Sequence, residues 1–458
     1  MSRHNPETLY LGGNHLFKTV DRGYHWQIIS PDLTTNDPVK TNRESGGVTR
    51  DVTGAETHGS ITAFSESWIN PSLLWVGTDD GNVQLTRNGG VTWVNVRQNI
   101  QNVPEGIWVS GVEASHFEEG ICYITFDGHR SDNLSAWVFK TTDFGQTWTN
   151  ITNNIPDGQV MYVVKEDLKN KNLLFAGSEF ACFTSLNGGK SWVRLMNNMP
   201  TVAIHDLAIH PRDGDLIAGT HGRGFWVLDD ITPLQQSTDE ILDSEAHIFK
   251  NRPMTIWEDA TRGGVRGHMF FAGENPPYIP KRENVVRAKL ISGGLINYYL
   301  KSKHKKQFVV EITDIVGKYK RSLMASNEPG INRVLWDFRF DPAPEQRKKF
   351  IARMKDVFNT LLSIPNLAKD QEDWIEEMKN KFERAKNDKE LNETREALLE
   401  HFRYERSLRQ VFGRRNIFGN RLQGRLADPG EYQVKMNVRG KIYSETITIR
   451  RDPKLNGW

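Results

Sequence analysis

The chain has 458 residues, and its 59 Lys and Arg residues against 57 Asp and Glu residues give a formal net charge of +2. This balance argues against nucleic acid as the main partner, because phosphate binding needs a concentrated excess of basic side chains. No apolar run reaches the roughly 18 residues that cross a bilayer, and two cysteines are too few for a disulfide framework. The length predicts about three globular units, and the 38 Gly and 13 Trp residues favour strands and turns.

The N-terminal sequence, MSRHNPETLYLGG, has no apolar h-region and no cleavage site, so it shows no secretory signal. It leads directly into a predicted strand, without the polar segment that usually precedes a domain. Two interpretations remain open: an intracellular protein, or a chain that begins inside a longer reading frame. The repeat described next favours the second.

One short pattern occurs four times in the first half of the chain. It reads Ser/Thr, any residue, Asp/Asn, any residue, Gly, any residue, Thr/Ser/His, Trp, and its copies are TVDRGYHW (19–26), TRNGGVTW (86–93), TTDFGQTW (141–148) and SLNGGKSW (185–192). The spacing of the copies suits one four-stranded propeller blade per copy. The pattern therefore predicts a repeat of small antiparallel sheets.

The residue types of the pattern are those of a β-hairpin turn. An Asp or Asn side chain accepts backbone N–H groups within its own turn, and Gly supplies a positive φ angle. We expect the Trp to pack between neighbouring blades. The pattern is therefore interpreted as structural, and the residues assigned to this turn role are Asp21, Asn88, Asp143 and Asn187.

Apolar, β-rich runs surround each copy and complete the blades. Three blades have four runs each, whereas the first lacks its innermost strand and the last lacks its fourth. About 4.5 blades are thus expected in residues 1–233. The predicted runs of the second blade lie at 61–67, 73–78, 82–86 and 92–96, and those of the fifth begin at 203, 216 and 224.

These segments resemble the Asp-box, or BNR repeat, of sialidase-like β-propellers, which also occurs in sortilin-type receptors and in xyloglucan-hydrolysing glycosidases. The strings GTDDGNVQLTRNGGVTW, FDGHRSDN and GTHGRGFWVLDDITPL are similar to bacterial proteins described as BNR-repeat glycosyl hydrolases or sortilin N-terminal-like proteins. Six or more blades are usual in that family, so the resemblance implies a C-terminal portion whose remaining blades come from a longer parent chain.

Up-and-down connectivity places the loops after second strands, and the connections between blades, on one face around the channel. Propellers bind ligands on such a face. Each residue alone can also be structural, since Asp closes tight turns and His or Arg can bond a neighbouring backbone. We call the opening of the channel on this face the channel mouth. The residues predicted to lie there are Glu56, His58, Asp79, Asp80, Asp127, His129, Arg130, Glu179, His221 and Arg223.

Glycoside hydrolysis needs two carboxyl groups at a defined separation, and Asp79, Asp127 and Glu179 are the catalytic candidates. The turn TDDG (78–81) is similar to the Thr-Asp-x-Gly turn that carries a catalytic Asp in xyloglucan-hydrolysing enzymes, with Asp79 in the matching place. The second acid of that family comes from a second propeller, which this sequence does not show. The three-arginine grip of sialidases cannot be assembled here either.

Histidines at positions 58, 129 and 221 could converge with acids, but no pair has the short spacing of metal ligands. No metal site and no cofactor is therefore assigned.

The second half of the chain changes character. We predict a linker at 234–268, a small antiparallel β-sandwich at 269–342 plus 424–453, and a helical insertion at 343–416 with apolar residues at helical spacing. The resemblance implies an immunoglobulin-like or fibronectin-like module for the sandwich. The insertion is expected to pack as a solvated helical hairpin or, alternatively, to dock a partner.

The expected fold class is thus mainly β, with sialidase- or sortilin-like blades followed by a sandwich interrupted by helices. The expected function is a glycosyl-hydrolase-like propeller that binds or cleaves glycan at the channel mouth. The alternative is a non-catalytic, sortilin-like module for peptide or protein ligands, or an assembly scaffold. An extracytoplasmic location is implied by the resemblance alone.

Overall fold

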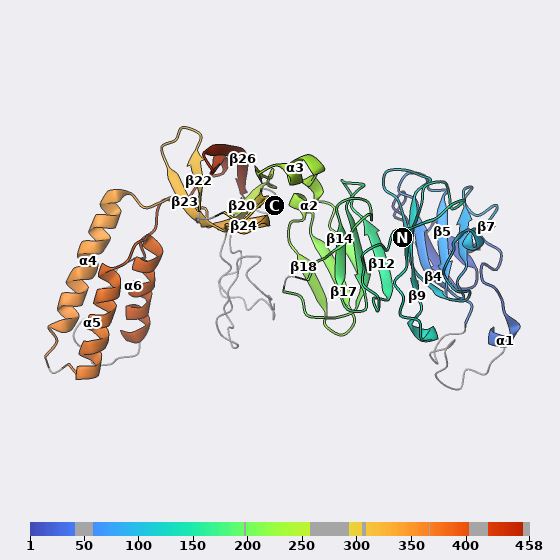
Figure 1. Cartoon of the computed structure of the whole chain (residues 1–458), viewed down its shortest axis with the longest axis horizontal. Coiled ribbons are helices and arrows are strands. Elements are labelled where there is room, and N and C mark those ends of the chain that lie inside the picture. Colours follow the sequence, from blue (N-terminus) through green and yellow to red (C-terminus); the bar gives the residue numbers. More distant parts are fainter. Residues whose placement is uncertain are drawn as a thin grey trace. The chain divides into compact units, whose positions relative to one another are not determined.

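The computed structural model of the chain describes residues 1–41, 58–196, 198–256, 293–304, 308–365, 367–402 and 420–451 (Figure 1). These residues form two compact units, Met1–Ser244 and a second unit that begins at Glu245. Across the described parts of the chain, no helix is long and apolar enough to cross a membrane. Glu56, a predicted ligand residue, lies outside the described residues.

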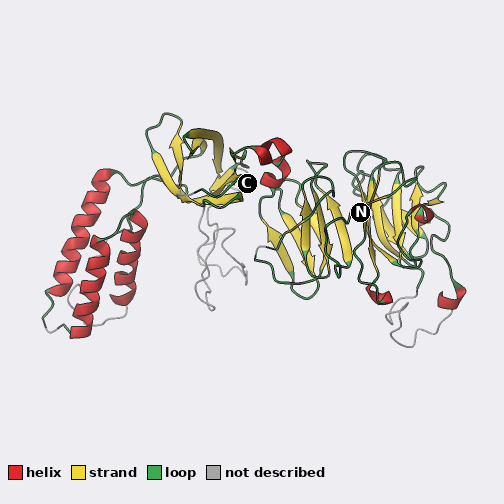
Figure 2. Ribbon diagram, viewed as in Figure 1, coloured by secondary structure: helices red, strands yellow, loops and turns green. Residues whose placement is uncertain are grey.

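The described residues of the first unit include five small antiparallel sheets in chain order, which we call blades 1 to 5. Blades 1 and 5 have three strands each and the others have four, as the sequence predicts, and the class is mainly β (Figure 2). The strands of blades 1 and 2 are β1 (Leu9–Gly12), β2 (Leu16–Thr19), β3 (Gln27–Ile28), β4 (Ile61–Glu66), β5 (Leu74–Thr78), β6 (Val83–Thr86) and β7 (Val94–Asn95). Those of blades 3 to 5 are β8 (Trp108–Ala114), β9 (Cys122–Asp127), β10 (Val138–Thr141), β11 (Thr149–Asn150), β12 (Met161–Glu166), β13 (Leu174–Ser178), β14 (Cys182–Ser185), β15 (Val193–Arg194), β16 (Ile204–Ile209), β17 (Leu216–Thr220) and β18 (Phe225–Leu228).

Apolar side chains fill the space between consecutive blades. Val83 of blade 2 and Ile124 of blade 3 belong to one buried cluster, and Met161 of blade 4 packs with Tyr123 of blade 3 in the next. The backbones approach closely at Gly77, where an added Cβ would lie 2.3 Å from Cγ1 of Val109. Successive sheets therefore stack face to face through a dry interface, which is the packing of propeller blades.

A β-bulge interrupts the first strand of blades 2 to 5 at the same place. The register with the second strand shifts there by one residue, so that a single residue is left unpaired. Such a bulge re-aims the side chain of the extra residue. The four bulged residues are Thr62, Ser110, Tyr162 and His205.

The bulged hydroxyl groups of blades 2 and 3 connect each blade to the next. Thr62 Oγ1 donates to the carbonyl of Val109 at 2.9 Å, and Ser110 Oγ donates to the carbonyl of Met161 at 2.7 Å. The bulge therefore helps dock neighbouring blades.

The four repeat turns share one hydrogen-bond network at the ends of the third strands. In blade 3, Thr141 Oγ1 donates to Asp143 Oδ1 at 2.8 Å and accepts from Gly145 N at 2.9 Å, while Asp143 Oδ1 accepts from Thr147 N at 2.9 Å. The same bonds recur around Asp21, Asn88 and Asn187. The Asp and Asn side chains therefore satisfy backbone groups of their own turns.

The repeat tryptophans differ in burial. Trp93 Nε1 donates to the carbonyl of Ile29 in blade 1, and Trp192 Nε1 donates to that of Ile151 in blade 3. Trp148 lies edge-on to Trp75 of blade 2 at 6.1 Å. In blade 1, Trp26 is 41% exposed. Three of the four rings thus contact the preceding blade.

In the second unit, the described strands form two sheets that share one core. A three-stranded sheet joins β19 (Ala246–Ile248), β21 (Gly294–Leu300) and β24 (Gly330–Trp336). A five-stranded sheet joins β20 (Met254–Ile256), β26 (Lys441–Arg451), β25 (Gly430–Val438), β22 (Phe308–Asp314) and β23 (Lys320–Ala325). Side chains of both sheets, such as Ile296 and Val434, meet in one buried cluster.

The stretch 234–268 departs from the expected linker. It contains α3 (Asp239–Asp243) and the strands β19 and β20, which pair with β21 and β26. The strands form because apolar residues within this polar stretch, Ile248 and Met254 among them, are buried in the shared core. The short helix α2 (Thr232–Gln236) precedes them, and residues 269–292 lie outside the described part.

The described residues between β24 and β25 form three helices, within the region expected to be a helical insertion. They are α4 (Pro344–Leu362), α5 (Lys369–Glu383) and α6 (Asp388–Phe402), drawn side by side in Figure 2. Their apolar stripes form a separate core that includes Met354, Leu361, Ile375 and Leu398. Residues 403–416 of the expected insertion lie outside the described residues.

We predict that Thr141→Val lowers the stability of the first unit by roughly 1–3 kcal/mol, because the buried Gly145 N–H loses its acceptor. At about 2–4 °C per kcal/mol for a unit of this size, calorimetry should show a lower melting temperature. The matched control is Thr149→Val on the exposed strand β11, for which a change within about 0.5 kcal/mol is expected. Equal melting temperatures for the two variants would contradict this role of the repeat threonine.

Candidate functional site

Seven polar and aromatic side chains gather where blades 3, 4 and 5 end on one face. They come from the end of β9 and the turn after it, the bulges of β12 and β16, and the turns that follow β13 and β17. We call this group the rim cluster, and its members are Asp127, His129, Arg130, Tyr162, Glu179, His205 and His221. Five of the seven are residues that the sequence predicts for the channel mouth.

Three rings form a continuous row across the rim cluster. The Tyr162 ring stacks on His205 with centroids 4.2 Å apart and an interplanar angle of 23°. His205 in turn lies 5.0 Å from His221, and His129 lies 6.4 Å from Tyr162 on the other side. Because Tyr162 and His205 are the bulged residues of their strands, the bulge places both rings on this face.

The carboxylates of the rim cluster accept hydrogen bonds from its own rings. Tyr162 Oη donates to Glu179 Oε2. Asp127 Oδ1 accepts from the backbone N–H of His129 at 2.9 Å and lies 2.6 Å from the Nδ1 of the same residue. The Arg130 guanidinium lies over the Trp108 ring, 3.6 Å from its centroid. Charged groups of both signs thus border the row of rings.

Burial and neighbours fix the protonation of two rings. Burial, with the hydrogen bond to Glu179 and the nearby carboxylates, raises the pKa of Tyr162 well above its usual value, so its hydroxyl stays a proton donor. Burial and the adjacent His221 lower the pKa of His205, although Glu179 and Asp127 act in the opposite direction. His205 therefore favours its neutral form.

A second group of predicted residues lies in blade 2, at the turn between β5 and β6. Asp79 is 1% exposed, and its Oδ1 accepts from Gly59 N at 3.0 Å and from Ser60 N at 2.8 Å. Burial raises the pKa of Asp79. The Asp79 side chain is thus buried and bound by backbone N–H groups, whereas a catalytic carboxylate must contact substrate.

Asp80 follows Asp79 in the same buried turn, and His58, at the end of the connection between blades 1 and 2, lies beside both. Asp80 Oδ2 accepts from the backbone N–H and from Oγ1 of Thr35, and its Oδ1 accepts from Thr78 Oγ1 at 2.5 Å. His58 Nδ1 lies 3.9 Å from Asp79 Oδ2. These residues hold the two ends of the connection between blades 1 and 2.

Arg223 lies apart from both groups. It is on the exposed turn between β17 and β18, where its carbonyl accepts from Trp226 Nε1 at 3.2 Å. Within the described residues, no hydrogen bond or ion pair joins its guanidinium to the rim cluster.

Sequence reasoning missed the importance of Tyr162 and Trp108. Both stand at the start of first strands, and Tyr162 occupies the bulged position that Thr62 and Ser110 occupy in earlier blades. Aligning the first strands as ITAF, VSGV, MYVV and IHDL would have shown that rings replace hydroxyl groups in the last two blades.

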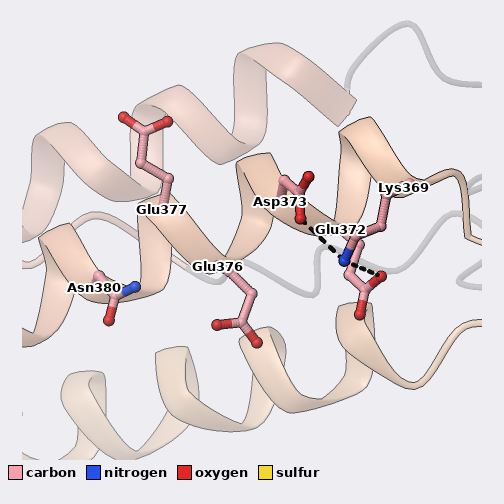
Figure 3. A pocket seen from close by; sticks show the side chains of 6 residues that line it. All are labelled: Lys369, Glu372, Asp373, Glu376, Glu377 and Asn380. Carbon is pink, nitrogen blue, oxygen red and sulfur yellow. Dashed lines mark hydrogen bonds and ion pairs between the residues drawn. The ribbon is translucent and has the colours of Figure 1, made fainter.

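A surface hollow on helix α5 is lined by residues of one face of that helix. Unlike the rim cluster, it does not bring together side chains from several elements. Figure 3 shows Lys369 Nζ between Glu372 and Asp373, at 3.2 and 3.1 Å, with Glu376, Glu377 and Asn380 farther along the helix. All three members of this ion-pair group are exposed. Solvated i,i+3 and i,i+4 pairs of this kind support a helix and define no ligand.

Comparison with known proteins gives structural likeness only. No protein-family profile and no curated protein matches the chain. Among solved structures, a GH74 xyloglucanase from Xanthomonas campestris is 22% identical over 52% of this chain and 36% of its own length, with a TM-score of 0.35. A GH74 enzyme from Niastella koreensis is 14% identical over 72% of this chain and 47% of its own, with a TM-score of 0.35.

YCF48 bound to D1 peptide is 19% identical over 37% of this chain and 51% of its own length, with a TM-score of 0.29. The chain thus spans between about a third and a half of the length of these structures.

We predict opposite shifts of the His205 pKa in two variants, measured by NMR titration of the ring. His221→Ala should raise the pKa, because a neighbouring imidazole that disfavours the charged form is removed. Glu179→Gln should lower it further, because a carboxylate that favours the charged form is removed. Shifts in the same direction would contradict the geometry of the rim cluster.

The lowered pKa of His205 also determines how the stability of the folded chain changes with pH. The unfolded chain binds a proton at His205 near the usual pKa of about 6.5, whereas the folded chain does so only at lower pH. Stability should therefore rise with pH between the folded-state pKa and about 6.5, and this contribution should be lost on acidification. His205→Gln should remove that part of the slope in urea titrations between these pH values.

Proposed function

We propose that the chain is a glycan-directed β-propeller protein that binds its ligand at the rim cluster. The observation that supports this proposal is the row of rings formed by Tyr162, His205 and His221, bordered by the carboxylates of Asp127 and Glu179. A pyranose ring has apolar C–H faces and a rim of hydroxyl groups. Flat rings accept the former, and carboxylates accept hydrogen bonds from the latter.

The position of the cluster suits this role. Its side chains come from the loop ends of three consecutive blades, which is where propellers bind ligands. The lowered pKa of His205 and the raised pKa of Tyr162 favour the uncharged forms of these two stacked rings, which suits packing against a neutral sugar.

If the protein hydrolyses its glycan, Asp127 and Glu179 form the catalytic pair. We leave Asp79 out of the proposed pair because it is 1% exposed and its carboxylate already accepts three hydrogen bonds from the N–H groups of Gly59 and Ser60. The reaction requires one carboxyl group as acid and the other as nucleophile or base. The Tyr162 hydroxyl would orient Glu179, and His129 would orient Asp127.

The finer family features belong to the same proposal. We propose that the repeat turns are Asp-boxes of a sialidase- or sortilin-like propeller, that the two sheets of the second unit form an immunoglobulin-like sandwich, and that α4 to α6 are its helical insertion. An extracytoplasmic location and further blades from a longer parent chain follow from the family resemblance.

A second candidate function is peptide binding at the edge of blade 5. Its third strand, β18, pairs with β17, and no other described strand pairs with it. Phe225 and Val227 on β18 are 82% and 52% exposed. An added strand could pair with such an edge and cover these side chains.

The proposal predicts that the full-length chain binds oligosaccharides on a glycan array and that calorimetry reproduces the strongest hit. Tyr162→Ala should weaken binding roughly 10-fold, about 1.4 kcal/mol, because the central ring is lost. The matched control is Tyr24→Ala, which removes an 84% exposed tyrosine from a repeat turn at the other end of the strands and should leave affinity unchanged.

Two results would contradict glycan binding at the rim cluster: no oligosaccharide bound by the wild-type chain, or equal affinities for Tyr162→Ala and wild type. Reducing-end assays then separate cleavage from binding. Sugar release that is lost in both Asp127→Asn and Glu179→Gln supports hydrolysis, whereas binding without release supports a lectin-like role.

A further inference from the structure

A buried histidine in blade 2 lacks the hydrogen bonds that its ring needs. His58 is 3% exposed, and neither Nδ1 nor Nε2 has a hydrogen-bond partner among the residues that the structure describes. A buried polar atom without a partner costs roughly 1–3 kcal/mol. Such a group is therefore uncommon in a folded protein and calls for an explanation.

Two buried carboxylates stand beside this ring. Asp79 is 1% exposed and Asp80 is 4% exposed, and the ligand atoms of His58, Asp79 and Asp80 all lie within 4.8 Å of one another. In the described part of the chain, neither carboxylate forms an ion pair with a Lys or Arg residue. Two adjacent buried anions without such a partner repel each other unless a cation or proton neutralises them.

From this juxtaposition we propose that His58, Asp79 and Asp80 form a binding site for a divalent cation of the zinc type. One imidazole nitrogen and two carboxylate oxygens are donors that Zn²⁺ accepts, whereas Ca²⁺ and Mg²⁺ prefer oxygen alone. Tetrahedral donors at about 2.1 Å from a shared cation lie roughly 3.4 Å apart, so a pair of ligand atoms at the 4.8 Å limit would close by about 1.4 Å.

Surrounding hydrogen bonds already orient the two carboxylates. Asp79 accepts from the N–H groups of Gly59 and Ser60, and Gly59 has a φ of +93°, which turns both N–H groups toward this side chain. Asp80 accepts from Thr35 and Thr78. Asp79 Oδ2 and Asp80 Oδ1 each accept only one of these bonds and retain a further lone pair for a cation. Outer hydrogen bonds of this kind are typical of ligands in metal sites.

The cation would join the two ends of the connection between blades 1 and 2. Thr35, near its start, is held by Asp80, and Gly59 and Ser60, at its end, are held by Asp79. A single ion bound to both aspartates and to His58 would therefore fix this connection to the β5–β6 turn. The site is separate from the rim cluster and does not depend on glycan binding.

The test uses the full-length chain after chelator treatment, titrated with Zn²⁺ by calorimetry. We expect one tightly bound Zn²⁺ per chain and a higher melting temperature of the first unit, because the ion binds the folded state. His58→Ala and Asp80→Asn should each weaken binding by roughly 100-fold or more, and Thr35→Ala, which removes one supporting hydrogen bond, by about 10-fold.

The matched control is His210→Ala. His210 and Asp213 form a His–Asp pair at 3.4 Å in blade 5 that is partly exposed and has no third buried ligand of this kind. Zn²⁺ affinity should stay within about twofold of wild type, since two exposed groups bind Zn²⁺ weakly. Ca²⁺ at equal concentration should not displace Zn²⁺.

If a His58 or Asp80 variant does not fold, the wild-type chain still decides the question. Loaded with Mn²⁺, it should show electron-spin coupling to the nitrogen of one imidazole. The proposal is overturned if the wild-type chain binds no Zn²⁺, if His58→Ala binds it as tightly as wild type, or if the bound ion shows no imidazole nitrogen.

Discussion

The single unpaired residue at the start of each first strand is the constraint on which both the stacking of the blades and the candidate site depend. At this bulge the strand register with its neighbour shifts, and the side chain of the extra residue is directed out of the ladder. In blades 2 and 3 the residue is Thr62 or Ser110, and its hydroxyl group bonds the backbone of the next blade. In blades 4 and 5 the same position holds Tyr162 and His205, which stack on each other instead. The same β-bulge thus links neighbouring blades by hydrogen bonds in blades 2 and 3 and positions the two stacked rings in blades 4 and 5.

The repeat made the first unit predictable in detail. The strands around each copy agree with the structure to within two residues for most elements, because alternating apolar runs and Gly-containing turns encode hairpins locally. The number of apolar, β-rich runs also correctly predicted three strands rather than four in blades 1 and 5. The polar stretch 234–268 was harder, since Ile248 and Met254 are isolated apolar residues whose partners, β21 and β26, lie far away in the sequence.

The candidate site was predictable only in part. Up-and-down connectivity is a topological rule, so it correctly brought Asp127, His129 and Glu179 to one face, together with His221. It could not distinguish a carboxylate that borders the row of rings from one that is bound by backbone N–H groups of another segment, as Asp79 is. That distinction depends on hydrogen bonds to Gly59 and Ser60, about twenty residues earlier, and no local pattern encodes them.

The two polar groups on this face consequently differ in chemistry. In blade 2 the carboxylates are buried and oriented by backbone N–H groups, an environment suited to an ion. In blades 3 to 5 the groups range from buried, at Asp127 and Tyr162, to exposed, at His205 and His221, and they are arranged around flat rings. This environment suits a larger ligand with apolar faces. The near-zero net charge of the chain gives no sign of either polar group, because each group combines acidic with basic or imidazole side chains.

The most direct measurement is the mapping of a bound oligosaccharide by NMR of the histidine rings in the full-length chain. The row of Tyr162, His205 and His221 predicts that the ring signals of His205 and His221 shift on addition of the glycan, while those of His15 and His25 in blade 1 do not. Unchanged His205 and His221 signals at a glycan concentration that saturates binding would contradict the assignment of the ligand site to the rim cluster.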